Sequence, residues 1–241
     1  MNAFVHAAGE PELAPSLTQR LQGLKALLFD LDGTLIDSAP DLAGAANELR
    51  AARGLPPLAY ELLRPMVGAG ARGMLAVSLQ IGPEHEEFDA LRSDFLARYE
   101  RRMLQLTAVF EAVPPVLAAL ASRRMPWGIV TNKAERFALP MTAALGLAQS
   151  AGAVIGGDTT PHAKPHPGSL LEAARRLEVA PEHCVYIGDD ERDIIAGRAA
   201  GMLTVAAAWG YLGQGRPVQD WGADLIVEQP QGLLAALQLP H

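Results

Sequence analysis

Short apolar runs separated by amphipathic stretches make up the chain from about residue 25 onward. One run, Ala26-Leu27-Leu28-Phe29, ends at Asp30, and another occupies 127–130 and ends at Thr131. Further apolar runs lie at 153–155, 185–187, 203–207 and 225–227, with helical patterns at 134–145, 167–178 and 191–200. Short continuous apolar runs that alternate with helices are typical of buried parallel strands. We therefore predict an α/β fold, with a mostly parallel sheet covered by helices on both faces.

The segment 37–110 interrupts this alternation, because it holds several helix-like stretches and no convincing strand. One predicted helix spans 41–53, with Pro40 near its start and Gly54 at its end. A second spans 84–104 and is acidic at its beginning and basic at its end, as the helix dipole favours. A crossover helix near 114–124 returns the chain to the sheet. The predicted division is an N-terminal tail (1–20) to which no role is assigned, a core (21–36 and 111–241) and a helical cap (37–110) over the catalytic edge of the sheet.

Composition and charge exclude several classes of partner. The 241 residues carry a net charge of −7, and basic residues never run longer than a pair, which argues against nucleic acid and anionic membranes as partners. No apolar stretch approaches the roughly 20 residues of a spanning helix, so we expect a cytoplasmic protein. The single cysteine, Cys184, lies in an apolar run and is expected to be a buried, inert thiol. Lysine is rare, with 3 lysines among 20 basic residues, so each lysine is a candidate for a specific task.

Four polar motifs each follow a predicted strand or the loop after one. Ligands of open parallel sheets bind beyond the carboxyl ends of the strands, so these motifs are expected to share one crevice. Any one motif alone has a plain structural explanation, such as a turn or a helix cap, and only their joint order indicates chemistry. In chain order they are Asp30-Leu31-Asp32-Gly33-Thr34, Thr131-Asn132, Lys164-Pro165 and Gly188-Asp189-Asp190-Glu191-Arg192-Asp193.

These residue types suit phosphoryl transfer. Asp30 can attack phosphorus and form an acyl phosphate, while Asp32 can protonate the leaving oxygen and later activate water. Asp189 and Asp193 lie one helical turn apart and can reach a hard cation such as Mg²⁺. Lys164 supplies a fixed positive charge, and the Thr131 hydroxyl can hold phosphoryl oxygens.

In these four motifs the chain resembles the haloacid dehalogenase superfamily of phosphohydrolases, from about residue 25 to its end. The resemblance implies a Rossmann-like core with a helical cap inserted after the first strand, and Mg²⁺ as cofactor. It gives Asp190 a weaker claim to the site than its neighbours, with capping of the following helix as the alternative, and implies that Asp193 either binds the metal or holds a ligand in place. The implied roles are nucleophile for Asp30, general acid and base for Asp32, phosphate binding for Thr131, Asn132 and Lys164, and metal binding for Asp30, Asp32, Asp189 and Asp193.

Further residues narrow the range of possible substrates. Asp32 argues against the true dehalogenases, which lack this carboxylate, and the absence of lysine from 37–126 argues against the phosphonate-cleaving members. The run Asp37-Ser38-Ala39-Pro40-Asp41-Leu42 is similar to the phosphoglycolate phosphatases, and 53–57 in the cap is similar to the phosphatases of N-acetylmuramic acid 6-phosphate. The expected substrate is a small phosphate ester, 2-phosphoglycolate first. Arg72, in a glycine-rich stretch of the cap, is either a carboxylate-binding residue or a solvated side chain.

The alternatives to a phosphatase differ in how well they fit the sequence. Phospho-accepting signalling domains use similar residues, but their acidic pair precedes the phosphorylated aspartate, and they lack the hundred-residue gap before the threonine. An inactive binding protein conflicts with the complete set of motifs. A phosphomutase uses the same chemistry at Asp30 and remains open, as does the choice between a monomer and a homodimer.

Overall fold

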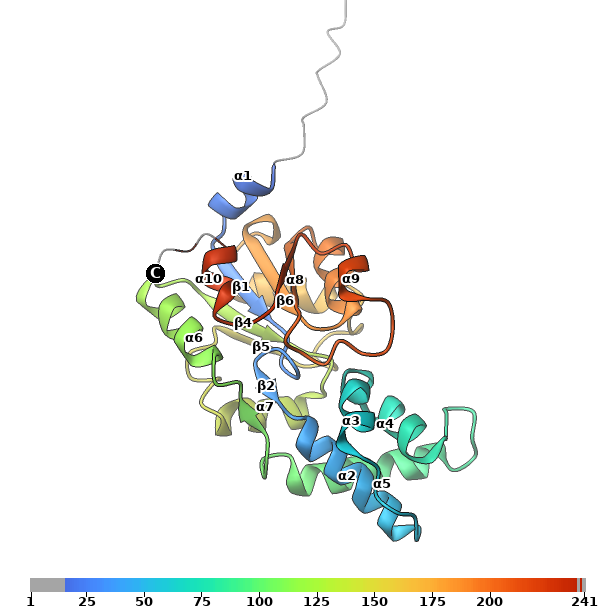
Figure 1. Cartoon of the computed structure of the whole chain (residues 1–241). Helices are drawn as coiled ribbons and strands as arrows, with labels where there is room; N and C mark the ends of the chain where they lie inside the picture. The colour runs from blue at the N-terminus through green and yellow to red at the C-terminus, as the bar shows by residue number, and fades with distance from the viewer. Residues whose placement is uncertain (1–15, 238, 240–241) are drawn as a thin grey trace, which may run out of the picture.

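A six-stranded, wholly parallel sheet forms the centre of the computed structural model, which describes residues 16–237 and residue 239 (Figure 1). The strand order is β5-β4-β1-β6-β7-β8, which places β1 between β4 and β6. All six predicted strands are confirmed, and only the strand predicted at 185–187 is one residue longer at each end. The strands are β1 Ala26–Phe29, β4 Trp127–Val130, β5 Ala153–Ile155, β6 Cys184–Gly188, β7 Leu203–Ala207 and β8 Leu225–Val227.

Both faces of the sheet are covered. Leu27 and Phe29 of β1 join an apolar cluster with residues of α6, α7 and α10, whereas Ala26 and Leu28 join a second cluster with α8 and α9. Because alternate side chains of a strand point to opposite faces, a strand buried on both faces must be apolar throughout. This explains the continuous apolar runs. The helices around the sheet are α6 Val113–Ser122, α7 Glu135–Ala144, α8 Gly168–Arg176, α9 Glu191–Ala199 and α10 Gly232–Ala236, with short 3₁₀ turns η2 Pro181–His183 and η3 Val218–Asp220.

The described chain begins with a short helix, α1 Leu17–Gln22. Ser16 caps it, since the Gln19 backbone N–H donates to Ser16 Oγ and the Ser16 N–H donates to Gln19 Oε1. Residues 1–15 of the predicted tail lie outside the described residues, and the predicted boundary at residue 20 falls inside α1. In the part of the chain that the structure describes, α-helices are too short or too polar to cross a membrane.

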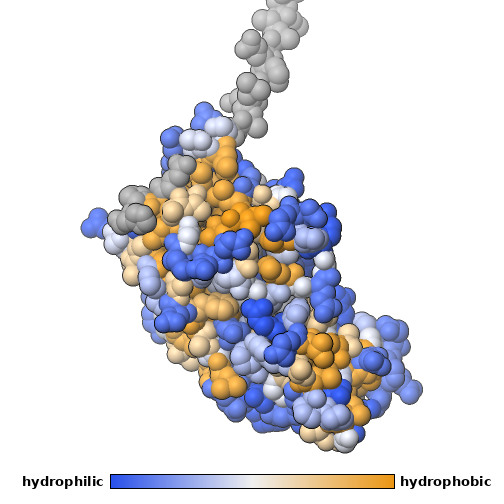
Figure 2. Space-filling model, viewed as in Figure 1, coloured by the Kyte–Doolittle hydropathy of each residue, from blue (hydrophilic) through white to orange (hydrophobic). Residues whose placement is uncertain are grey.

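A helical cap is inserted between β1 and α6 and lies at one side of the sheet, at the lower right of Figure 1. Phe88, Leu91, Phe95 and Tyr99 follow helical spacing on α5 and are buried, and α5 packs along α2. Hydrophobic surface on the core and on the cap occurs in patches within a mostly hydrophilic surface (Figure 2). The cap elements are α2 Ala39–Ala52, α3 Tyr60–Leu63, the 3₁₀ helix η1 Arg64–Ala69, α4 Gly70–Leu79 and α5 Phe88–Arg102.

The cap is joined to the core through a two-stranded antiparallel ribbon, in which β2 Ile36–Asp37 pairs with β3 Ala108–Val109. The prediction that 37–110 contains no strand is therefore wrong. Strands of two residues are too short to produce a periodic pattern, so the sequence gives no signal for them. The ribbon places the segment that leaves the core beside the segment that returns to it. The strands before and after the cap can therefore join one sheet.

Candidate active site

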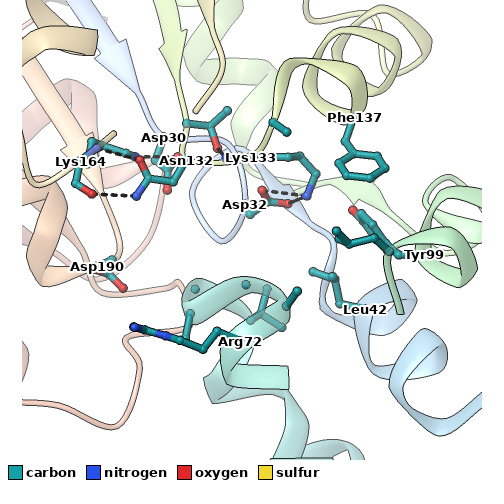
Figure 3. A pocket seen from close by; sticks show the side chains of 18 of the residues that line it. Asp30, Asp32, Leu42, Arg72, Tyr99, Asn132, Lys133, Phe137, Lys164 and Asp190 are labelled. Carbon is teal, nitrogen blue, oxygen red and sulfur yellow. Dashed lines mark hydrogen bonds and ion pairs between the residues drawn. The ribbon is translucent and has the colours of Figure 1, made fainter. Parts of the chain in front are cut away.

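Asp30, Thr131 and Asp189 follow three neighbouring strands, β1, β4 and β6, at their carboxyl ends. The Asp30 N–H donates to the Ile187 carbonyl at 2.8 Å, and the Thr131 N–H donates to the Ile155 carbonyl at 2.9 Å. These bonds continue the sheet ladder and fix the backbone from which each side chain leaves. The predicted crevice at this edge of the sheet is therefore present (Figure 3).

Lys164 is the central cation of the crevice and is almost fully buried. Its Nζ lies 2.9 Å from Asp30 Oδ1 and 2.7 Å from Asp193 Oδ1, and it donates to Tyr186 Oη at 2.7 Å. Burial alone would lower the pKa of Lys164, but Asp193 and Asp30 outweigh it and raise that pKa above its usual value. Lys164 thus stays charged at neutral pH.

Asn132 positions Lys164 through the main chain. Its Oδ1 accepts from the Lys164 N–H at 2.9 Å, and its Nδ2 donates to the Lys164 carbonyl, also at 2.9 Å. Both polar atoms of the Asn132 side chain are therefore engaged. If Asn132 binds phosphate as predicted, it would do so through its backbone N–H.

Three carboxylates, those of Asp30, Asp189 and Asp193, form a buried cluster, each with an oxygen within 4.8 Å of the others. Asp189 is held by Thr34 Oγ1 at 3.0 Å and by the Tyr211 N–H at 2.7 Å. Burial, followed by repulsion from Asp30 and Asp193, raises the pKa of Asp189 well above its usual range.

This cluster fits a hard cation. Lys164 lies within 2.9 Å of Asp30 Oδ1, yet that oxygen accepts no hydrogen bond of good geometry from the residues that the structure describes. Three carboxylates facing one ammonium leave excess negative charge in a buried space. A divalent metal that prefers oxygen ligands would neutralise it.

Asp32 lies outside this cluster, and its predicted role as a side-chain metal ligand does not match its surroundings. Lys133 Nζ donates to both of its carboxylate oxygens, at 2.9 and 3.0 Å, and Ser38 Oγ donates to one of them at 2.5 Å. Figure 3 shows the Asp32 carboxylate pointing toward Lys133, and Asp32 is not among the three clustered carboxylates.

Asp190 caps α9, as predicted. It forms a capping box with Asp193, and it also pairs with Arg192, whose guanidinium donates to the carbonyl of Gly68 in the cap. Arg64 of the cap donates in turn to the Gly210 carbonyl of the core at 3.1 Å. Two arginines thus bridge core and cap beside the crevice.

A cavity of about 540 Å³ lies between the cap and the sheet edge. Arg72 of α4 borders it, with an exposed side chain that lies on the Asp190 side in Figure 3. The structure therefore brings every predicted site residue to one cavity: Asp30, Asp32, Arg72, Thr131, Asn132, Lys164, Asp189 and Asp193.

Several residues that hold the site in place were not predicted from the sequence, among them Ser38, which donates to Asp32. Thr34 and Tyr211 hold Asp189, and Lys133 pairs with Asp32. The role of Tyr211 could not be predicted, because nothing in its local sequence connects it to Asp189. Lys133 did carry a signal, since it is one of three lysines and directly follows Thr131-Asn132.

The chain is similar to known proteins along most of its length. The family model described as "Haloacid dehalogenase-like hydrolase" matches residues 27–207. The chain is 48% identical over 210 residues to a phosphoglycolate phosphatase of Xanthomonas campestris pv. campestris, covering 87% of this chain and 94% of the relative. It is 40% identical to an N-acetylmuramic acid 6-phosphate phosphatase of Pseudomonas aeruginosa, covering 89% and 95%. A crystal structure of a predicted phosphoglycolate phosphatase from Haemophilus somnus superposes with a TM-score of 0.79 at 26% identity, covering 89% and 98%.

Proposed function

The chain belongs to the haloacid dehalogenase-like hydrolases and is a phosphatase of that family, and from this premise we propose that it hydrolyses small phosphate monoesters through a phospho-aspartate on Asp30. The main support for this mechanism is the position of the Asp30 carboxylate and its contacts. Its Oδ1 is buried beside Lys164, whereas the side chain as a whole is 13% exposed and borders the cavity. A carboxylate held by one oxygen can use the other to attack phosphorus.

Lys164 and Thr131 hold the phosphoryl group in this mechanism. Both are buried and border the cavity, and Lys164 carries a positive charge in a site of low dielectric constant. Charge fixed in advance at the position where charge accumulates stabilises the transition state without reorganisation. Asn132 acts by keeping the Lys164 main chain in place.

Asp30, Asp189 and Asp193 are the residues that would hold Mg²⁺. Magnesium bound there would neutralise repulsion between the carboxylates and the phosphoryl oxygens. The excess of buried negative charge and the oxygen-only donor set support this assignment. Thr34 and Tyr211 fix the orientation of Asp189 for the same purpose.

Asp32 moves the proton. It stands two residues after Asp30, and its side chain is 15% exposed toward the cavity. It gives a proton to the ester oxygen as the bond to phosphorus breaks, and it takes a proton from water in the second step. Ser38 and Lys133 hold its carboxylate in place between the two steps.

The leading substrate is 2-phosphoglycolate, supported by the phosphoglycolate phosphatase relative at 48% identity. The cavity favours a second candidate, N-acetylmuramic acid 6-phosphate. A volume of about 540 Å³ is typical of sites for drug-sized ligands, whereas 2-phosphoglycolate has only about nine non-hydrogen atoms. The cap side of the cavity is also largely apolar, through Leu42, Val67, Phe95, Leu96 and Tyr99. On this proposal the cap, approximately 37–110, selects the substrate.

The test is phosphate release from 2-phosphoglycolate, N-acetylmuramic acid 6-phosphate and a set of sugar phosphates, each with magnesium and with chelator. Preference for 2-phosphoglycolate that disappears in chelator supports the leading assignment. Preference for the muramic acid ester keeps the mechanism and changes the substrate. Absence of phosphate release from every ester refutes the proposed hydrolysis, and transfer of phosphate within one sugar would then indicate a mutase.

A further inference from the structure

Resting on the proposed phosphatase function, we propose that Lys133 binds a second anionic group of the substrate, located beside the phosphoryl group. The favoured substrates are therefore phosphate esters that carry a carboxylate two bonds from the ester oxygen. Lys133 is a specificity-determining residue on this proposal. It is distinct from Lys164, which serves the phosphoryl group that all substrates share.

Lys133 is held rigidly at the cavity. It lies in the turn between β4 and α7, where its N–H donates to Thr131 Oγ1 at 3.1 Å and its carbonyl accepts from the Gly157 N–H at 2.8 Å. Its side chain is only 8% exposed, yet it borders the cavity. A buried ammonium in a fixed position loses little entropy when it binds an anion, and so it is suited to recognition.

The ammonium lies between the catalytic acid and the cap. On one side it donates to both oxygens of Asp32, and on another it lies 4.8 Å from the centre of the Tyr99 ring of α5. Figure 3 shows the order across the cavity, with Asp30 and Lys164 at one end, the Asp32–Lys133 pair next, and Tyr99 and Phe137 beyond it. A substrate whose phosphoryl group lies at Asp30 extends toward Lys133.

The distances suit a short spacer. An acid that protonates the ester oxygen must come within about 2.6–3.2 Å of it. Lys133 Nζ lies at 2.9 and 3.0 Å from the oxygens of that same acid, Asp32. A carboxylate whose carbon is two bonds from the ester oxygen therefore falls near Nζ and can share the ammonium with Asp32 or replace it. A lysine ammonium has three N–H donors, so both acceptors can be served.

The other cavity cations are less suited to this task. Arg72, Arg92 and Arg136 also border the cavity, but all three side chains are exposed. Arg192 borders it as well, but its guanidinium already pairs with Asp190 and donates to the Gly68 carbonyl. Exposed charges are screened by solvent and contribute little to specific binding. Lys133 combines burial with contact to the catalytic acid.

The experiment compares 2-phosphoglycolate with 2-phosphoglycolamide, a neutral probe of almost the same shape. The measured quantity is the ratio of their kcat/KM values in the wild type, in Lys133→Met and in Lys25→Met, which removes an exposed lysine elsewhere. Loss of a hydrogen bond between charged groups predicts that Lys133→Met lowers the ratio about 10- to 100-fold. Both activities also fall, since Asp32 loses a partner. Lys25→Met leaves the ratio unchanged.

A second variant guards against misfolding. Lys133→Cys treated with 2-bromoethylamine regains a lysine-like side chain, and the only native cysteine, Cys184, is buried. Recovery of the ratio on alkylation supports the proposal. Equal loss for both substrates in Lys133→Met, or a wild-type ratio near one, overturns it while leaving the phosphatase function standing. Failure of the wild type to hydrolyse either ester also overturns it, and the phosphatase function then depends on the result with the muramic acid ester and the sugar phosphates.

Discussion

Asp41 Oδ2 accepts hydrogen bonds from both the N–H and the hydroxyl of Thr107, at 2.8 and 2.9 Å. The same oxygen accepts from the Leu106 N–H at 2.9 Å. Asp41 belongs to the first turn of α2, and Thr107 directly precedes β3. A single buried carboxylate thus connects the beginning of the cap to its end. This contact explains why residue 41 in the run Asp37–Leu42 is an aspartate. The sequence alone shows only that the run is similar to a family of phosphatases.

Asp41→Ala is expected to lower the free energy of unfolding by about 3 kcal/mol, because the two buried donors of Thr107 and the partly buried Leu106 N–H lose a charged acceptor. Urea titration followed by circular dichroism measures the change. Asp94→Ala is the matched control, since it removes an aspartate on the same cap that pairs with Arg98 at the surface, where an ion pair contributes less than about 1 kcal/mol. Equal losses for the two variants would show that Asp41 does not fasten the cap.

Asp30→Asn is expected to abolish turnover, with at least about a thousand-fold loss of kcat, because an amide cannot form the acyl phosphate. The fold should survive, since Lys164 keeps Asp193 as its partner. Steady-state kinetics and a thermal melt test both statements. Substantial residual activity in a folded variant would contradict the covalent mechanism.

Arg72→Ala is expected to raise KM for 2-phosphoglycolate more than for a neutral sugar phosphate. The predicted effect is about three-fold, smaller than that of Lys133→Met, because the Arg72 side chain is exposed. Initial rates over a range of substrate concentration provide the measurement. If KM rises equally for both substrates, Arg72 does not bind a carboxylate.

The sheet and the order of the catalytic motifs could be predicted because both depend on short-range patterns. A strand buried on both faces must be apolar throughout, and a residue that follows such a strand must lie at the sheet edge. Asp30, Thr131 and Asp189 satisfy both conditions. The residues Lys164 and Asp193 then reach the same crevice from a loop and from a helix.

Contacts between distant segments could not be predicted in the same way. Tyr211 reaches Asp189 from 22 residues away, and Lys133 reaches Asp32 across 101 residues. Neither pairing produces a periodic pattern of residues from which it could be predicted. The direction of the Asp32 carboxylate depended on Lys133, which is why the sequence suggested a metal ligand where the structure has an ion pair.

Cys184 is expected to resist thiol reagents in the folded protein at pH 8. Burial, with a smaller effect of Glu182, raises the pKa of this thiol from 9.0 to about 11, and the thiolate is the reactive form. A chromogenic disulfide reagent should therefore label the chain only in denaturant. Between pH 9 and about 11 the unfolded thiol ionises while the folded one does not, so this group destabilises the fold as pH rises through that window. Cys184→Ala should remove that part of the alkaline loss, and rapid labelling of the native protein at pH 8 would refute the assignment.

Gly33→Ala tests why glycine follows Asp32: because a side chain has no room there, or because the backbone has a positive φ. Gly33 has φ +82°, and an added Cβ would lie 2.1 Å from Asp189 Oδ2 and 2.8 Å from the Tyr211 ring. Gly54 has a similar φ of +70°, but an added Cβ would meet nothing within 4 Å. Alanine at either position suffers the left-handed backbone penalty, of the order of 1 kcal/mol, so Gly54→Ala isolates that contribution.

The collision is specific to Gly33, and it displaces Asp189 from the three-carboxylate cluster. We expect Gly33→Ala to raise the magnesium concentration required for half-maximal activity at least about ten-fold, as loss of a positioned ligand does. Gly54→Ala should leave this concentration unchanged while sharing the small loss of stability. Magnesium titrations of activity, together with urea melts of both variants, separate the two effects. A magnesium requirement that moves equally in both variants would mean that Asp189 does not depend on the open space at Gly33.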